Sequence, residues 1–246
     1  MALCTGNSMT GTSGINGDNF YISPDNTTFL LADGASGAGK EGKVTMSAHC
    51  VNIIKEHPFG ALGLSPDAYL DTMIWKINND LIEISQQTKT YTFGTLVLCV
   101  VHDDTAIIAS VGDSPAYFIQ DSHIKRIAKP QKTYQGLIDA GFLTETEAES
   151  YIEKLHDYMQ SMFDKFIPMV VPEYTIESIP LTADDMMMLC SDGIGDFLTP
   201  EEIKNTINPN QLENSITTVM NTAKTRSIQK HQRNFYDDIT AIIYRH

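Results

Sequence analysis

Residues 186–197 have the sequence MMMLCSDGIGDF, in which five apolar residues are followed at once by Ser191, Asp192 and Gly193. A short apolar run of this length is typical of a strand that is buried on both faces. Asp followed by Gly is also a common way to turn the chain after a strand. The stretch therefore predicts a buried strand that presents a carboxylate at its end, either in an ordinary turn or in a site.

Four more predicted strands begin or end at an aspartate. TFLLADG and IIASVGD end at Asp33 and Asp113, while NGDNFYI and YDDITAII begin at Asp18 and at Asp237–Asp238. A turn explains any one of these boundaries, but five of them predict that the folded sheets bring carboxylates to one rim. Like charges at close range raise each other's pKa and destabilise the fold unless a cation neutralises them.

The predicted ligand set consists of oxygen donors, with no His or Cys at ligand spacing. Mg²⁺ and Mn²⁺ prefer carboxylate, carbonyl and water oxygens, whereas zinc prefers nitrogen and sulfur. Bridging carboxylates suit two ions about 3.5–4 Å apart, a pair that stabilises in-line displacement at phosphorus and lowers the pKa of a bridging water from about 15.7 towards neutrality. The pattern therefore indicates a hard divalent cation centre.

Helical periodicity predicts two helices in the first third of the chain. Residues 42–57 place four apolar side chains on one helical face: Val44, Ala48, Val51 and Ile54. A second helix is capped at Ser65–Pro66 and carries apolar residues at helical spacing over residues 70–84. Further along, Thr199 begins a short helix with a capping box, and Asn208–Pro209 begins a long polar helix that ends near Arg226.

The strands come in runs instead of alternating regularly with helices. NFYIS and TTFLLADG flank a turn, and YTFGTLVLCVV, TAIIASVGD and PAYFI predict a meander that turns first at residues 102–104. EYTIESIPL, DMMMLCSD and DITAIIY follow as strands. Runs of strands with helices clustered between them predict the α+β class.

Composition sets limits on the class of protein. A chain of 246 residues, 42% of them hydrophobic, fits a single domain over 1–246. No stretch of 18 apolar residues and no secretory signal is present, and four scattered cysteines suit a reduced, cytoplasmic protein, which we expect to be a monomer. The net charge of -14 argues against partnership with nucleic acid or an anionic membrane, while it permits a cation site.

The ordered stretches LLADGASG, FGTLVLCVV, ASVGDSPAY, LCSDGIGDFLT and YDDITAIIY resemble the motifs of the metal-dependent Ser/Thr protein phosphatases, the PPM or type 2C family. The match in order and spacing covers nearly the whole chain. The resemblance implies an α-β-β-α sandwich of two central antiparallel sheets flanked by helices. It also implies a flap-like insertion around residues 129–171, where GLIDAGFLTETEAE resembles the helix-turn-helix of the family's flap.

The same resemblance implies a metal centre with two Mn²⁺ or Mg²⁺ ions. Asp33 would bridge the two ions, and the carbonyl of Gly34 would bind one of them. Asp192 and Asp237 would complete the other ion. Asp18 would sit at the second metal through water.

Asp113, with Asp192, would match the family's third and weaker metal site. The implied catalytic residues are Asp33, Asp192 and Asp237. The implied reaction is hydrolysis of phosphoserine and phosphothreonine monoesters on a phosphorylated protein, by direct attack of a metal-bridging hydroxide on phosphorus.

Several groups that grip phosphate in the family are replaced here. Ser13 stands where many members carry Arg, Pro115 ends Gly-Asp-Ser-Pro in place of an Arg, and Ala35 replaces a proposed general acid His. Three cations are candidate substitutes, although each is more typical of a solvated surface charge: Lys40, Lys43 and Arg233.

Two alternatives stay open beside the phosphatase. The loss of the phosphate-binding residues favours a binding or scaffold protein of this fold, with little or no activity. An acidic calcium-binding structural domain is also conceivable, although no EF-hand loop is present. A cysteine phosphatase is excluded because no Arg stands six residues after any cysteine.

Overall fold

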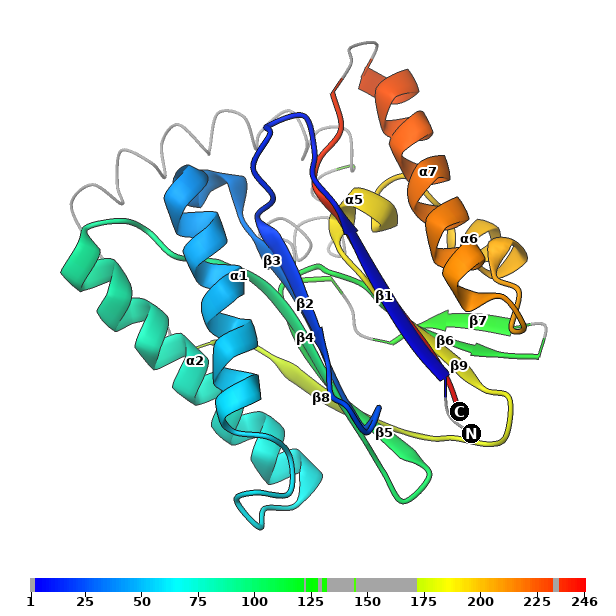
Figure 1. The fold of residues 1–246 in the computed structure, drawn as a ribbon, viewed down its shortest axis with the longest axis horizontal. Coiled ribbons are helices and arrows are strands. Elements are labelled where there is room, and N and C mark those ends of the chain that lie inside the picture. Colours follow the sequence, from blue (N-terminus) through cyan, green and yellow to red (C-terminus); the bar gives the residue numbers. More distant parts are fainter. Residues whose placement is uncertain (1–2, 122, 128–129, 132–143, 145–171, 232–234) are drawn as a thin grey trace.

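The computed structural model describes residues 3–121, 123–127, 130–131, 144, 172–231 and 235–246. Two five-stranded antiparallel sheets pack face to face between two layers of helices (Figure 1). This arrangement confirms the predicted α+β class and the α-β-β-α sandwich. The predicted flap-like insertion at 129–171 lies outside the described residues, except for residues 130, 131 and 144.

The first sheet has the strand order β1-β10-β9-β6-β7, with bounds β1 Leu3–Met9, β10 Ile239–Arg245, β9 Met186–Cys190, β6 Ala116–Gln120 and β7 His123–Arg126. The second has the order β2-β3-β4-β5-β8, with bounds β2 Asp18–Ile22, β3 Thr28–Gly34, β4 Gly94–His102, β5 Thr105–Val111 and β8 Thr175–Pro180. Strand β1 therefore pairs with β10 from the other end of the chain, in a register that joins Leu3 to Arg245.

Helices cover the outer face of each sheet. The second sheet packs against α1 Gly39–Glu56, which follows a short 3-10 turn Ser36–Ala38, and against α2 Pro66–Thr88. The first sheet packs against α5 Asp192–Gly195, α6 Pro200–Thr206 and α7 Leu212–His231. Among the described residues, no helix combines the length and the apolar character that crossing a membrane requires.

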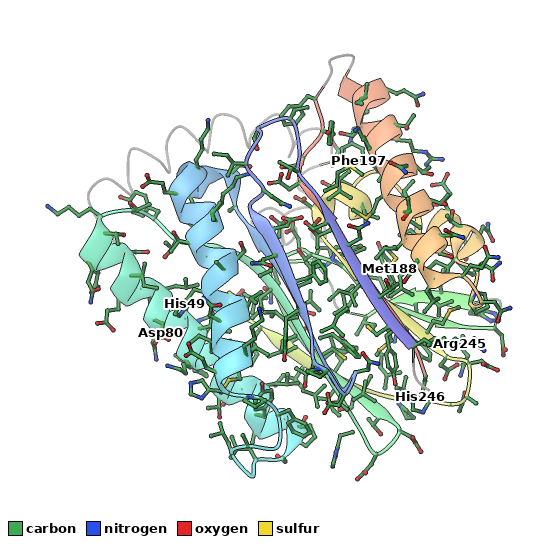
Figure 2. All side chains as sticks on the ribbon, viewed as in Figure 1. His49, Asp80, Met188, Phe197, Arg245 and His246 are labelled. Carbon is green, nitrogen blue, oxygen red and sulfur yellow. The ribbon has the colours of Figure 1, made fainter. Side chains whose placement is uncertain are left out.

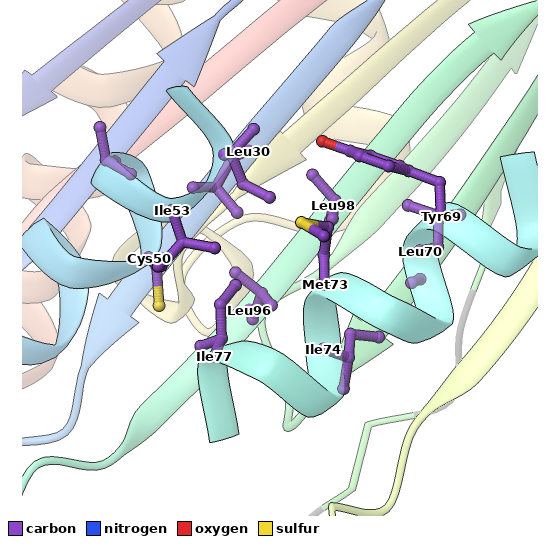
Figure 3. Close-up of a cluster of buried hydrophobic side chains, with 14 of the residues drawn as sticks. Leu30, Cys50, Ile53, Tyr69, Leu70, Met73, Ile74, Ile77, Leu96 and Leu98 are labelled. Atoms are coloured by element: carbon purple, nitrogen blue, oxygen red, sulfur yellow. The ribbon is translucent and has the colours of Figure 1, made fainter. Parts of the chain in front are cut away.

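Four layers create three apolar interfaces, and this explains the uninterrupted apolar strands. In β9, Met186, Met188 and Cys190 face the helices, while Met187 and Leu189 face the other sheet. Figure 3 shows the interface under α1 and α2, where Leu30, Leu96 and Leu98 of the sheet meet the helices. Because both faces of these strands are covered, alternation between apolar and polar residues is lost.

The predicted meander is wrong at its last step. Strands β4 and β5 pair as predicted, but β6 pairs with β7 and β9 in the first sheet instead of with β5. The chain changes sheets across residues 112–115, where Gly112 has a positive φ of 88° and Pro115 lacks an N–H for a ladder. Strands β1 and β7 were not predicted, because neither carries an apolar run.

Two helix predictions also need correction. In α1, Val51 and Ile54 are buried as predicted, but Val44 is 38% exposed, and Lys43, Met46 and Cys50 belong to the buried face. Helix α7 begins at Leu212 and continues to His231, later at both ends than predicted. The Asn208 side chain accepts a hydrogen bond from the backbone N–H of residue 210 at 2.9 Å, which forms a turn where the helix was expected to begin.

Candidate metal centre

Antiparallel pairing explains why strands that begin and strands that end at aspartate share one rim. Asp18 opens β2 and lies directly opposite Asp33 near the end of β3. In the other sheet, Asp192 follows the end of β9 and Asp237 precedes β10, its antiparallel neighbour. Neighbouring strands run in opposite directions, so the end of one lies beside the start of the next.

The electrostatics show that these carboxylates are close neighbours across the two sheets. Burial is the largest cause that raises the pKa of Asp33 well above its usual value, and the charges of Asp18, Asp192 and Asp237 raise it further. As a whole residue, Asp33 is only partly buried, whereas the five residues before it in β3 are buried. Four of the five strand boundaries predicted to carry an aspartate therefore lie close together, around Asp33.

Asp18 is the most enclosed carboxylate of the group, with a relative exposure of 7%. Burial raises its pKa to about 6, while the hydroxyl groups of Thr240 and Ser191 act in the opposite direction. Its buried Oδ2 atom has no hydrogen-bond partner in the described part of the molecule. A buried carboxylate oxygen without a donor is costly, and a bound cation would satisfy it.

Asp113 reaches the rim from β5 and approaches Asp192. Burial raises the pKa of Asp192 to about 8, and the charges of Asp196, Asp237 and Asp113 contribute in that order. The start of β6 packs closely against α5, since a methyl group at Gly195 of α5 would lie 2.6 Å from the Pro115 ring.

Asp196 is a carboxylate of the site that sequence reasoning missed. It follows α5, one helical turn after Asp192, and its backbone N–H donates to the Asp192 carbonyl oxygen at 2.9 Å. Spacing of four residues on a helix places two side chains on one face. That spacing in SDGIGD was the signal that could have revealed it.

The glycines beside the aspartates are required for close backbone packing. A methyl group at Gly34 would lie 2.2 Å from the carbonyl oxygen of Lys43, and one at Gly94 would lie 2.1 Å from the carbonyl oxygen of Asp33. Separations this short exclude any larger residue without a backbone shift. Glycine here lets α1 and β4 approach the strand end that carries Asp33.

The predicted surface cations behave differently from one another. Lys43 is 5% exposed and forms an ion pair with Asp238 at 2.7 Å, so its assignment as a solvated charge was wrong. Lys40 is exposed, as expected, and Arg233 lies outside the described residues. Lys43 is therefore part of the folded interior next to the rim.

The carboxylates are adjacent but do not form a finished coordination shell. Within the ranges that the structure describes, no three Asp, Glu, His or Cys side chains converge on one point closely enough to hold an ion. A cavity of about 430 Å³ lies nearby, lined by residues that include Ile77, Leu81, Gly94 and Gly112. None of the rim aspartates is among its lining residues, so the acidic site is separate from this cavity.

The side-chain chemistry fits a hard divalent cation. The neighbouring groups are carboxylates with raised pKa values, and one buried oxygen has no partner in the described region. The cysteines do not fit a thiolate site, because burial raises the pKa of Cys50 to about 12 and moves that of Cys190 above its usual value. Oxygen donors of this kind suit Mg²⁺ and Mn²⁺.

Comparison with known proteins gives relatives of one kind. The Ser/Thr protein phosphatase PstP of Mycobacterium tuberculosis is 25% identical over 178 residues, which cover 70% of this chain and 32% of PstP. The chain thus spans about a third of the length of that relative. Protein phosphatase PhpP of Streptococcus pneumoniae is 27% identical over 208 residues, which cover 77% of this chain and 76% of PhpP.

Solved structures share the fold over almost the entire chain. The M. tuberculosis phosphatase PstP/Ppp has a TM-score of 0.80 at 20% identity, covering 99% of this chain and 98% of that one. The catalytic domain of PstP in complex with two manganese ions has a TM-score of 0.76 at 20% identity, covering 99% and 97%. The family model described as protein phosphatase 2C matches residues 5–235. The chain therefore belongs to the protein phosphatase 2C family.

Proposed function

We propose that this chain is a metal-dependent phosphatase that hydrolyses phosphoserine and phosphothreonine monoesters on proteins. The observation that carries the proposal is the group of Asp18, Asp33 and Asp192, whose pKa values are all raised and which act on one another electrostatically. Such a group costs stability unless a cation binds to it. Family membership supplies the reaction, since the relatives are named Ser/Thr protein phosphatases.

In this proposal, five residues hold two Mn²⁺ or Mg²⁺ ions: Asp18, Asp33, the Gly34 carbonyl, Asp192 and Asp237. Asp113 and Asp192 hold a third, weaker ion, and Asp196 adds charge beside them. When bound, the ions supply Lewis acidity towards the phosphoryl oxygens and lower the pKa of water. The protein residues fix the spacing of these ions, because their carboxylates come from four strand ends in two packed sheets.

The proton affinity of the carboxylates bears on metal loading. Asp192 and Asp18 have pKa values raised to about 8 and about 6, so protons and divalent cations compete for the same oxygens near neutral pH. A carboxylate must lose its proton before it binds a metal ion. We therefore expect metal affinity to rise with pH over this range.

The test is a Mn²⁺ titration of protein first stripped with EDTA, with an aryl phosphate and a phosphothreonine peptide as substrates. We expect turnover to require Mn²⁺, and Asp33→Asn to lower it by about 10²-fold or more. Asp104→Asn is the matched control, because Asp104 lies in an exposed turn with its carboxylate 81% exposed. Metal-independent turnover, or full activity in Asp33→Asn, would overturn the proposal.

A binding or scaffold role is the second candidate, and one observation favours it. Ser13 stands where the family carries an Arg, and the nearby amine of Lys43 is already engaged by Asp238 at 2.7 Å. Neither residue offers an uncompensated positive charge to a phosphate. Mn²⁺ binding without hydrolysis of either substrate would select this role over catalysis.

A further inference from the structure

A buried ion pair lies directly behind the acidic rim. The Lys43 amine of α1 is 2.7 Å from Oδ2 of Asp238, and the two side chains are 6% and 5% exposed. Asp238 also accepts hydrogen bonds from two backbone N–H groups, that of Gly11 at 2.7 Å and that of Gly17 at 2.8 Å. One carboxylate therefore ties α1 and the loop between β1 and β2 to the start of β10.

The Lys43 side chain also packs against the segment of Asp18, and the backbone carbonyls of Lys43 and Asp238 pack against the segments of Asp33 and Asp192. A methyl group at Gly17 would lie 2.5 Å from the Lys43 side chain, and one at Gly34 would lie 2.2 Å from the Lys43 carbonyl oxygen. A methyl group at Gly193 would lie 2.2 Å from the Asp238 carbonyl oxygen. Each of these contacts involves the residue next to a predicted ligand in sequence, the ligands being Asp18, Asp33 and Asp192, and Asp238 itself follows Asp237.

We propose that Lys43 and Asp238 are positioning residues for divalent cations, because their paired side chains join the segments of Asp18 and Asp237 while their backbone packs against the segments of Asp33 and Asp192. This inference rests on the metal centre proposed above. The four segments carry carboxylates that repel one another, so other interactions must hold these segments together before an ion binds. A buried ion pair with further hydrogen bonds gives little net stability but defines geometry, because removing one partner leaves the other charge unpaired.

For the substitution Lys43→Met, a purely electrostatic role and a positioning role predict opposite changes in Mn²⁺ affinity. Lys43 carries a positive charge close to the site, so Lys43→Met removes a charge that repels a cation. If charge alone mattered, the variant would bind Mn²⁺ more tightly. If Lys43 acts by positioning, the variant binds Mn²⁺ more weakly although it has one more net negative charge.

The experiment measures Mn²⁺ binding by calorimetry on EDTA-stripped full-length protein, with no substrate present. We expect Lys43→Met to weaken Mn²⁺ affinity by about tenfold or more, as is typical when a residue behind a metal ligand is lost. Lys43→Arg retains the charge and should recover part of the affinity. Unchanged or tighter binding by a folded Lys43→Met would overturn the proposal.

Lys76→Met is the matched control, because it removes the same charge from a more exposed ion pair, formed with Asp80 on α2, where Figure 2 labels Asp80. It should leave Mn²⁺ affinity unchanged. If Lys43→Met does not fold, the double variant Lys43→Met/Asp238→Asn replaces it, since no unpaired charge is then buried. The double variant should also bind Mn²⁺ at least about tenfold more weakly than wild type, and equal affinity would overturn the proposal.

The outcome for wild-type protein separates the two proposals. If wild type does not bind Mn²⁺, the metal centre itself is wrong. If wild type binds Mn²⁺ and Lys43→Met binds it equally well, the centre stands and only the positioning role fails. A fall in thermal stability equal for Lys43→Met with and without Mn²⁺ would indicate a merely structural pair and would also overturn the positioning role.

Discussion

The two ends of the β-sandwich both carry aspartates, but in different surroundings. At the rim, Asp18 and Asp192 are enclosed, and burial and like charges raise their pKa values. At the opposite end, Asp103 and Asp104 turn the chain between β4 and β5, with carboxylates 90% and 81% exposed. Figure 2 labels His246 at that end, where its ring lies 3.2 Å from Asp104.

The far-end aspartates suit turns because of their backbone conformation. Asp103, Asp104 and Asp184 have φ values of 46°, 52° and 76°, in the left-handed region that Asp tolerates better than most residues. Asp184 pairs with Arg245, a cation near the end of β10. The comparison teaches that an aspartate at a strand end indicates a site only when the fold encloses it among others of its charge.

The largest expected difference between the ends is the response to metal. Mn²⁺ at about 100 times its Kd should stabilise wild-type protein by about 2.7 kcal/mol. Asp192→Asn should lose most of this gain, and yet be more stable than wild type in EDTA, because folded wild type retains at neutral pH a proton on Asp192 that the unfolded chain releases. Thermal unfolding with and without Mn²⁺ measures both effects. A lower Tm for Asp192→Asn in both conditions would contradict the expectation.

The next difference concerns pH. The folded pKa of Asp192 is raised to about 8, so between the unfolded value of 3.8 and about 8 the folded state retains a proton that the unfolded state releases. The contribution of Asp192 to the stability of metal-free wild type should therefore be greatest at low pH and decline as pH rises towards about 8.

Tm measured in metal-free buffers from about pH 5 to pH 8 tests this decline. Asp192→Asn should show a shallower decline than wild type, whereas Asp104→Asn, at the far end, should follow wild type. Parallel profiles for wild type and Asp192→Asn would show that this carboxyl is not responsible.

The smallest effect is expected at the far end itself. Asp104→Gly relieves a left-handed conformation but adds freedom to the unfolded chain, and the two effects oppose each other. We expect a change in unfolding free energy within about 0.5 kcal/mol, and no change in Mn²⁺ affinity. Chemical denaturation and calorimetry measure the two quantities. A change in Mn²⁺ affinity would show that the two ends are coupled.

Local patterns were sufficient for most of the fold. Uninterrupted apolar runs predicted β3, β4, β9 and β10, and Ser65 and Thr199 marked helix starts that the structure confirms with hydrogen bonds to the backbone. The aspartates at strand ends predicted a shared rim, and the structure places them together. Their role as metal ligands stays a prediction.

Features that depend on tertiary packing were missed. The chain passes from the second sheet to the first between β5 and β6. This change of sheet depends on how the two sheets stack, and no residue in PAYFI indicates it. Lys43 was assigned to the surface because a lysine is seldom buried, and its partner Asp238 lies 195 residues away. Asp196 directly follows a short helix and does not lie at a strand end, so the pattern of aspartates at strand boundaries does not include it.

The pairing of β1 with β10 has a consequence for biosynthesis. Because β10 follows β1 by more than two hundred residues, the first sheet cannot form its pairing of β1 with β10 until β10 has been synthesised. Contacts so distant in sequence slow folding. Since Asp237 and Asp238 directly precede β10, the acidic rim is also not assembled in a nascent chain that still lacks this strand.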